Sequence, residues 1–385
     1  MSMAPPTIRS GPLLFGMLVV AQVLGTSVWF APGAAPEDLL ERWNATSLTY
    51  TTLATQAGFV LGTLIFALSG LADRFRASHI FAISAVLASA STWPLLAATS
   101  EIQACFLRLA TGACLAGVYP LGMKLVVSWF PDRSPQALAW LVGALVLGTA
   151  SPFLLRAMGT SAHAERVLSG SCTGAILAAL MVLAVGDGPH LRRAPALSWR
   201  GLKTVIANPD YRIALAGYLG HMAELYAFWA LVPALARSIG LSSSLAVFAV
   251  IAMGTAGCLA GGTLAGKLGA AGVAKVALAI SAGCGLAWPW VASSDSWCAM
   301  AILGLWGATV VADSPQFSAL ASKACPPDAV GSGLTLQVSL GFALTMPAIT
   351  ILGWFEARHG PWVGLLLAVG PILGLLAMAM NKPRG

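Results

Sequence analysis

The sequence predicts an all-α integral membrane protein whose twelve transmembrane helices form two pseudo-symmetric six-helix bundles. Three observations lead to this fold class. The composition is too apolar for a soluble protein, twelve apolar runs are long enough to cross a bilayer, and several landmarks of the first half of the chain return in the second half.

The composition requires a membrane environment. Of the 385 residues, 58% are hydrophobic and 9% are charged, and the mean hydropathy is +0.82. A soluble protein has about 25% charged residues, so this chain cannot cover itself with a water-compatible surface. A helical crossing needs about 20 apolar residues. Runs of this kind lie at roughly 11–33, 46–70, 79–98, 102–128, 136–158, 165–185, 212–236, 243–265, 272–293, 297–321, 330–353 and 361–380. Continuous runs exclude a β-barrel, whose spans are short and alternate.

An internal repeat divides the chain in half. Trp93-Pro94 returns as Trp288-Pro289, Pro120 as Pro315 and Pro131 as Pro326, in each case 195 positions later. Repeats of this size are a known architecture of membrane transporters. We therefore expect an N-terminal bundle at 1–185, a cytoplasmic linker at 186–211 with a short interfacial helix at 198–206, and a C-terminal bundle at 212–385.

The distribution of Lys and Arg predicts the orientation. Cytoplasmic loops carry an excess of basic residues, and with both termini inside, the loops and span ends on the cytoplasmic side hold fifteen and those on the opposite side hold five. The fifteen are Arg9, Arg74, Arg76, Lys124, Arg133, Arg192, Arg193, Arg200, Lys203, Arg212, Lys267, Lys275, Lys323, Lys382 and Arg384. This bias explains the net charge of +7 without a nucleic-acid partner. We expect a multi-pass protein of a cell membrane, specifically a bacterial inner membrane.

Neither processing nor metal chemistry is indicated. The first apolar run follows one Arg and has no clear cleavage site, so we interpret it as a retained span and not as a signal peptide. The seven cysteines lie in or beside predicted spans without paired ligand spacing, which favours buried thiols. We expect no metal and no cofactor.

The first span carries polar side chains on one face. Gln22 and Thr26 are four residues apart and therefore neighbours on a helix, and Trp29 follows them. These groups could line an aqueous path. Equally, they could make the interhelical hydrogen bonds that are common in membranes.

A charged hairpin, SGLADRFR at residues 69–76, follows the second span. It resembles the loop between spans two and three of the major facilitator superfamily, which carries Gly-x-Leu-x-Asp-Arg-x-Gly-Arg. Leu71, Asp73 and Arg74 match that motif, while both family glycines are replaced. The resemblance extends to the six-plus-six plan of the whole chain, and it implies a twelve-helix transporter that works as a monomer.

The second copy of the hairpin is more altered. Lys267 aligns with Arg74, and Gly266 replaces the acidic residue of the motif. In the family, this loop secures the inner gate by contacting neighbouring helix ends. The resemblance therefore implies that Asp73, Arg74 and Lys267 are conformational-gate residues and not substrate ligands.

The fourth span contains Arg108-Leu-Ala-Thr-Gly112, which is similar to the family signature Arg-x-x-x-Gly. An Arg in hydrocarbon costs several kcal/mol and usually faces a cavity or a partner. Arg108 is expected to bind an anionic substrate group or to take part in proton coupling. The alternative is a side chain that extends outward to the interface. Gly117 and Gly122 permit close helix packing, and Pro120 can bend this span.

The seventh span is the richest in ionisable groups. His221 and Glu224 are three residues apart and share a helix face. A carboxylate near a span centre is costly unless it is paired or protonated, and both states suit a proton carrier. The alternative is a buried His-Glu pair that holds helices together. A metal site would need further carboxylates, and Asp313 is the one candidate.

The tenth span adds Asp313 and Gln316 around Pro315. A Pro frees backbone carbonyls where a helix breaks, a device that transporters use at binding sites. The alternative is a simple kink in which Asp313 caps the lower half-helix.

In the family, spans one, four, seven and ten line the central cavity, so the resemblance and the positions of the charges indicate one site. Substrate contacts are expected for Arg108, Gln22, Trp29, Tyr218, Trp229 and Gln316, and proton coupling for Glu224, His221 and Asp313. We expect a secondary transporter that takes up a small organic or inorganic anion with a proton. The alternative is proton-antiport export of amphipathic or cationic compounds. We find no nucleophile–base pair, so we do not expect an enzyme. The expected partners are a small solute, protons and the bilayer.

Overall fold

The computed structural model describes residues 11–159, 161, 163–191, 199–293, 296–326 and 329–380. Within these residues the chain is helical and contains no strand. The first half contains α1 (Gly11–Thr26), η1 (Ala31–Ala34), α2 (Pro36–Trp43), α3 (Thr49–Ser69), α4 (Leu71–Arg74), α5 (Ala77–Thr92), η2 (Trp93–Leu96), α6 (Glu101–Leu115), α7 (Tyr119–Trp129), η3 (Pro131–Arg133), α8 (Ser134–Ala157) and α9 (His163–Val185).

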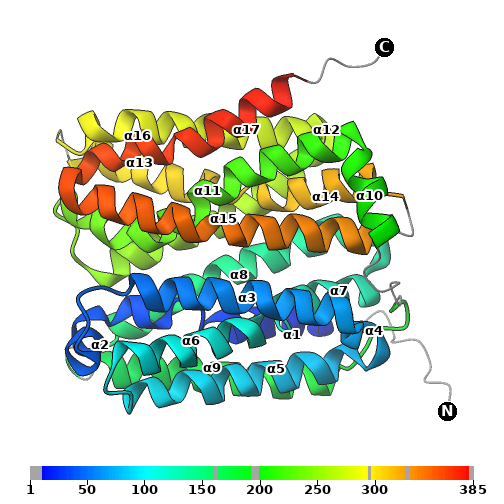
Figure 1. The fold of residues 1–385 in the computed structure, drawn as a ribbon, viewed down its shortest axis with the longest axis horizontal. Coiled ribbons are helices and arrows are strands. Elements are labelled where there is room, and N and C mark those ends of the chain that lie inside the picture. The colour runs from blue at the N-terminus through cyan, green and yellow to red at the C-terminus, as the bar shows by residue number, and fades with distance from the viewer. Residues whose placement is uncertain are drawn as a thin grey trace.

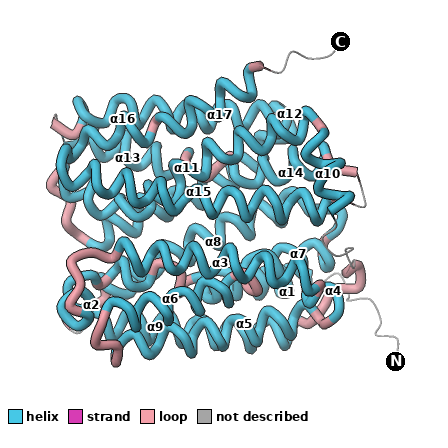
Figure 2. Tube along the Cα trace, viewed as in Figure 1, coloured by secondary structure: helices cyan, strands magenta, loops and turns pink. Residues whose placement is uncertain are grey.

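The described residues of the second half are also helical. It contains α10 (Trp199–Ala207), α11 (Pro209–Ser238), α12 (Ser244–Val291), α13 (Ser296–Thr309), α14 (Ser314–Ala324), α15 (Val330–His359), η4 (Gly360–Trp362), α16 (Val363–Leu367) and α17 (Val369–Ala379). In Figure 1, the helices up to α9 lie in the lower part of the view and those from α10 onward in the upper part. The trace in Figure 2 shows the long helices running in roughly the same direction.

Nine helical segments among the described residues are long and apolar enough to cross a membrane, and α1 is a shorter apolar helix. The molecule is therefore a multi-pass membrane protein. We call the end of the helices that carries α2 the α2 end, and the opposite end, which carries α4 and α10, the α10 end (Figure 1). The helix α10 occupies residues 199–207, which confirms the short helix expected in the linker.

Two long segments contain a break. The 48 residues of α12 would extend about 72 Å as one straight helix, roughly twice the hydrocarbon thickness of a bilayer. Gly269 interrupts it with φ 70° and ψ 160°. In residues 330–379, the turn η4 separates α15 from α16 and α17.

The fourth and tenth predicted spans are each broken near a proline. Pro120 lies in the first turn of α7, just after α6 ends, and Pro315 lies in the first turn of α14, just after α13 ends. Proline fits the first turn of a helix because it has no N–H to donate, so it begins the second half-helix in each span. The two prolines are the pair that the sequence repeat aligns, and the bend expected at Pro120 and the break expected at Pro315 are confirmed.

Small residues let the helices approach closely. A Cβ added to Gly58 in α3 would lie 2.0 Å from the carbonyl oxygen of Leu109 in α6. Between the two halves of the chain, α8 packs on α12 and α3 packs on α15. At the first of these contacts the Thr255 hydroxyl donates to the carbonyl of Gly143 across 2.9 Å. Packing and interhelical hydrogen bonds of this type drive helix association in lipid.

Candidate functional site

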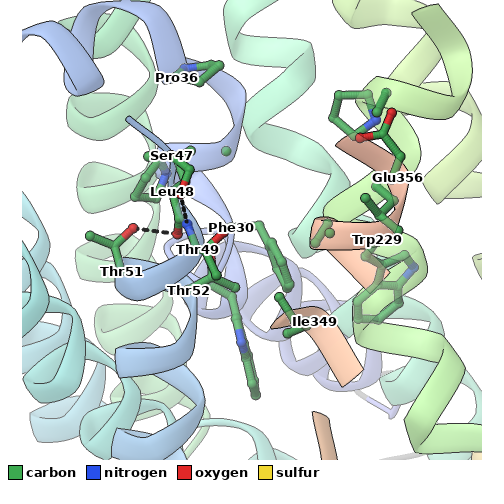
Figure 3. A pocket seen from close by; sticks show the side chains of 18 of the residues that line it. Phe30, Pro36, Ser47, Leu48, Thr49, Thr51, Thr52, Trp229, Ile349 and Glu356 are labelled. Carbon is green, nitrogen blue, oxygen red and sulfur yellow. Dashed lines mark hydrogen bonds between the residues drawn. The ribbon is translucent and has the colours of Figure 1, made fainter. Parts of the chain in front are cut away.

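A cavity of about 300 Å³ opens between the two halves at the α2 end. In Figure 3 it lies between the first turn of α3, with Thr49 and Thr52, and the segments of α11 and α15 that carry Trp229 and Ile349. Its volume is at the lower end of the range of roughly 300–1,000 Å³ that is typical of small-molecule sites. The cavity can therefore hold a compact solute and has walls from both halves.

Arg108 lines this cavity from α6 and is 2% exposed. Its two terminal nitrogens donate to consecutive carbonyls: Nη1 donates to Val28 across 2.9 Å, and Nη2 donates to Trp29. These carbonyls lie in the turn that follows the end of α1 at Thr26, outside the helix and its backbone hydrogen bonds. The guanidinium fork thus fixes the segment that turns from α1 into η1. The predicted Arg108 lies in the cavity wall, and its two terminal nitrogens are engaged with the backbone.

Aromatic rings close the inner side of the cavity. Trp29 lies 4.9 Å from Phe59 of α3, 5.7 Å from Tyr226 of α11 and 5.6 Å from Phe342 of α15, measured between ring centroids. Phe59 and Phe342 approach within 4.2 Å. We call Trp29, Phe59, Tyr226 and Phe342 the aromatic floor. It joins both halves, and Trp29 lines the cavity from it.

Two predicted proton-coupling residues form a buried pair in the second half. Nδ1 of His221 on α11 lies 2.8 Å from Oδ1 of Asp313, at the start of α14, and the side chains are 0% and 2% exposed. The contact is at ion-pair distance and is not an aligned hydrogen bond, and Nε2 of His221 has no hydrogen-bond partner among the residues that the structure describes. The break before α14 places Asp313 beside α11. Its side chain does not cap α14, so the capping alternative is not realised.

Glu224 is held separately from this pair. Ser281 of α12 donates its hydroxyl to the carboxylate, with both oxygens at 2.8 Å, and the indole N–H of Trp306 on α13 donates to Oε1 at 2.6 Å. All three side chains are buried. Among the described residues, His221 contacts Asp313 and Glu224 contacts Ser281 and Trp306, so the alternative of a buried His-Glu pair is not realised. Glu224 instead joins α11, α12 and α13 within the second half.

The other residues predicted to contact substrate do not all line the cavity. Trp229 lines the cavity, whereas Gln22, Tyr218 and Gln316 do not. Gln22 is 0% exposed, and within the described part of the chain neither atom of its amide has a hydrogen-bond partner, so the alternative of an interhelical bond is not realised there. Tyr218 lies 5.9 Å from the ring of His221. Gln316 is 4% exposed in the first turn of α14.

The predicted gate residues lie at the α10 end, away from the cavity. Arg74 and Lys267 are exposed. Asp73 lies in α4, and its side chain is outside the described residues. Near α4, the acidic residue Asp187 makes two contacts. Its carboxylate accepts the backbone N–H of Ser78 at 2.8 Å and lies 3.8 Å from Nε of Arg76. Asp187 thereby ties the start of α5 to the segment after α9.

Sequence patterns alone do not reveal several residues of the site. Ser281, Phe59 and Phe342 are ordinary residues of apolar spans, and their roles depend on partners in other helices. Arg237 and Glu356 line the cavity at the ends of α11 and α15, where the sequence suggests only loop charges. In the described part of the chain, no three His, Cys, Asp or Glu side chains gather as metal ligands do.

Comparison with known proteins gives one family. The sequence profile of the Major Facilitator Superfamily matches residues 17–349. This match includes most of the residues that line the cavity, from Trp29 to Ile349, and ends before Gly353 and Glu356 of α15. No curated protein sequence matches the chain.

Proposed function

The chain belongs to the Major Facilitator Superfamily of secondary transporters, and we propose that it carries a small anion together with a proton by alternating access. Alternating access means that one central site faces each side of the membrane in turn, as the two halves move against each other. The cavity open at the α2 end and the aromatic floor beneath it suit the state that faces one side.

The topology that we propose has twelve spans. The break at Gly269 divides α12 into two spans. The turn at η4 separates α15 from the last span, which contains α16 and α17, and α1 with its following turn supplies the first span. Residues 1–185 and 212–385 would then be six-helix halves, joined by a linker at 186–211. The α10 end would face the cytoplasm, because the positive-inside bias favours it. A bacterial inner membrane suits this arrangement.

The observation that carries the proposal is the order of groups along α11. Trp229 lines the cavity, Tyr226 belongs to the aromatic floor, and His221 pairs with Asp313 beyond the floor. From Trp229 to His221 is about 12 Å along the helix at 1.5 Å per residue. A titratable pair so close to a solute cavity, and excluded from solvent, has the position required of a proton-coupling group.

The mechanism follows from the cost of a buried charge. An anion enters the cavity from the α2 end and is drawn by Arg108 and Arg237. A proton held between His221 and Asp313, or taken up by Glu224, leaves no unpaired carboxylate charge and so lowers the electrostatic cost of closing apolar walls around these groups. The aromatic floor then separates, since its rings come from both halves, and the site opens to the α10 end. Release of the proton there resets the carrier.

A competing function has one observation in its favour. Glu356 is half-buried in the cavity wall, and a carboxylate there could attract a cation. Export of a cationic or amphipathic compound by proton antiport would use this group with Asp313. The two proposals differ in the sign of the solute that drives proton movement.

Proteoliposomes loaded with a pH-sensitive dye test the proposal. Nitrate, methanesulfonate, benzenesulfonate and tetraethylammonium are added outside in turn, because these ions keep their charge and do not leak as neutral acids. Proton entry driven by an anion, and lost in Asp313→Asn, supports proton-coupled anion uptake. Proton exit driven only by tetraethylammonium would reject the anion and favour the antiport function.

A further inference from the structure

Two buried indole N–H groups in the cavity wall find no acceptor among the described residues. Trp29 and Trp229 both line the cavity, each is 2% exposed, and Nε1 of each lacks a hydrogen-bond partner in the described part of the chain. They come from opposite halves of the chain, Trp29 from the turn after α1 and Trp229 from α11. Buried indole N–H groups usually find a partner, so a ligand that brings an acceptor would complete this wall.

The charged groups of the wall point to the same kind of ligand. Arg108 and Arg237 are opposed by one carboxylate, that of Glu356, so the wall has one net positive charge. The terminal nitrogens of Arg108 already donate to backbone carbonyls. Arg108 therefore contributes mainly its positive charge to the inner wall, because its terminal nitrogens already donate to other acceptors. A small inorganic oxyanion, which needs several donors around it, would be poorly satisfied here.

Flat apolar surface makes up much of the remaining wall. Phe30 lies between the halves in Figure 3, and its ring stacks at 6.1 Å on Tyr226 and meets Trp229 edge-on at 6.2 Å. Trp29, Phe153 and Ile349 add apolar surface. Planar ligand groups pack well in offset or edge-on contact with such rings.

We infer that the substrate is a flat organic monoanion, with an aromatic or conjugated body and one carboxylate-like group, and that the indole N–H groups of Trp29 and Trp229 donate to this group. The inference rests on the proposed anion transport and narrows its substrate from small anions in general to this class. The planar body occupies the ring-lined part of the cavity, and the anionic group lies toward Arg108.

Two other solute classes match the wall less well. A small inorganic anion leaves the ring surface uncovered by apolar groups. An amphipathic cation finds the rings and Glu356, but it has no acceptor for the two indole donors and meets two arginines.

Binding to the purified full-length protein tests the inference. Benzoate is the probe, and acetate, nitrate and benzylammonium are its comparisons, measured by calorimetry at one pH. Benzoate is expected to bind about tenfold or more tightly than acetate, because its ring is buried in addition to the carboxylate. Benzylammonium has a similar shape and the opposite charge, and no binding is expected.

Variants separate the indole N–H from the indole ring. Trp29→Phe and Trp229→Phe keep an aromatic ring but remove the donor, and each should weaken benzoate binding by about tenfold. Trp288→Phe is the matched control. Trp288 is also buried, and its Nε1 has no partner among the described residues, but it packs on Trp306 and does not line the cavity. The affinity of the Trp288→Phe protein for benzoate should stay within twofold of that of the unaltered protein.

Each remaining outcome is decisive. Binding of acetate or nitrate as tight as that of benzoate would overturn the inference and leave proton-coupled anion transport standing. Equal affinities in Trp29→Phe, Trp229→Phe and Trp288→Phe would overturn the role of the indole donors. Binding of benzylammonium alone would overturn both the inference and the anion function. If benzoate at millimolar concentration does not bind, while thermal unfolding shows folded protein, the inference is also overturned.

Discussion

Nδ1 of His221 lies 2.8 Å from Oδ1 of Asp313, and this pair joins α11 to α14 at a position where the sequence repeat places a helix break. The break at Pro315 is what allows Asp313 to reach α11. The same break in the first half, at Pro120, has no acidic residue beside it. The repeat therefore places a proline break in both halves, but among the described residues a buried His-Asp pair lies beside the break in the second half alone.

Asp313→Asn is expected to uncouple protons from solute. The amide keeps an oxygen near His221 but cannot exchange a proton. Uptake of benzenesulfonate driven by a pH gradient should fall at least tenfold, while exchange of the same anion at equal pH should remain within about threefold. Asp132→Asn, in an exposed turn, is the control and should change neither rate. Loss of both activities in the folded Asp313→Asn protein would assign Asp313 to solute binding.

The carboxylate of Glu224 should be coupled energetically to Trp306. The 2.6 Å contact between Nε1 and Oε1 is a hydrogen bond to a buried acid, and such bonds are worth about 1–3 kcal/mol. In a double-mutant cycle, Glu224→Gln and Trp306→Phe should therefore give a coupling free energy of unfolding of about 1–2 kcal/mol. Reversible unfolding in mixed micelles measures it.

The control for this cycle replaces Trp306→Phe by Trp43→Phe. Trp43 is also buried and also donates its indole N–H, but to the carbonyl of Leu95 in the first half. Glu224→Gln and Trp43→Phe should be additive within about 0.5 kcal/mol. A coupling as large as that with Trp306 would mean that the effect spreads through the whole fold.

The features that follow from local chemistry were predictable from the sequence. The long apolar runs predicted membrane helices, Pro120 predicted a bend, and Pro315 predicted a break or a kink. The family assignment from the hairpin at 69–76 and from Arg108 is confirmed by the match over residues 17–349. In these cases, one residue type has one dominant effect on its own segment.

Pairings between distant segments were not predictable in the same way. His221 could pair with Glu224 on its own helix or with Asp313 on another, and helix spacing alone favoured the first. The partners of Glu224 lie 57 and 82 residues away, and Ser281 is one of many small residues in an apolar span. Arg108 was expected to face a cavity, but nothing local indicates that its partners are the carbonyls of Val28 and Trp29.

The break in α12 depends on a glycine conformation. Gly269 has a φ of 70°, a region that an L-residue occupies only with strain. Gly269→Ala should lower the free energy of unfolding by about 1–2 kcal/mol. Gly266→Ala is the control, since a Cβ at Gly266 meets nothing within 4 Å and its φ is helical. It should be neutral or slightly stabilising, by up to about 1 kcal/mol. Similar costs for both variants would argue that the break does not depend on Gly269.

An ion pair at the α2 end should respond to acid. Glu37 of α2 lies 2.8 Å from Nη1 of Arg156. Partial burial acts to raise the pKa of Glu37, but the hydrogen bond and charge of Arg156 outweigh it and hold the pKa below the usual 4.5. Because the folded pKa is depressed, the pair stabilises the protein above pH 4.5 and loses this contribution as the pH falls through the folded pKa.

The variant Glu37→Gln measures this contribution. Since Glu37 is 68% exposed, the stability lost near neutral pH should be less than about 1 kcal/mol. The difference from the unaltered protein should narrow as the pH drops below the usual pKa of 4.5. Glu41→Gln, on an exposed side of the same helix, is the control and should leave the free energy of unfolding near neutral pH within about 0.5 kcal/mol of the unaltered protein. A constant difference for Glu37→Gln would contradict the depressed pKa.

Arg108→Lys distinguishes a fixed fork from a simple positive charge. Lysine keeps the charge in the cavity, but its ammonium cannot donate in the planar fork that reaches the carbonyls of both Val28 and Trp29. One buried carbonyl would then lose its partner, so the free energy of unfolding should fall by about 1–3 kcal/mol. Trp29 should shift with the loosened segment, and the affinity for benzoate should fall by about tenfold or more.

Arg237→Lys is the matched control for this change, because Arg237 lines the same cavity but is exposed at the end of α11. Its stability should stay within about 0.5 kcal/mol of the unaltered protein, as is usual for exposed substitutions, and its affinity for benzoate within threefold. If Arg108→Lys matched Arg237→Lys in both measurements, charge alone would account for Arg108. A selective loss in Arg108→Lys would mean that this residue shapes the site by holding the turn after α1, and that the anion meets a wall already built by the guanidinium.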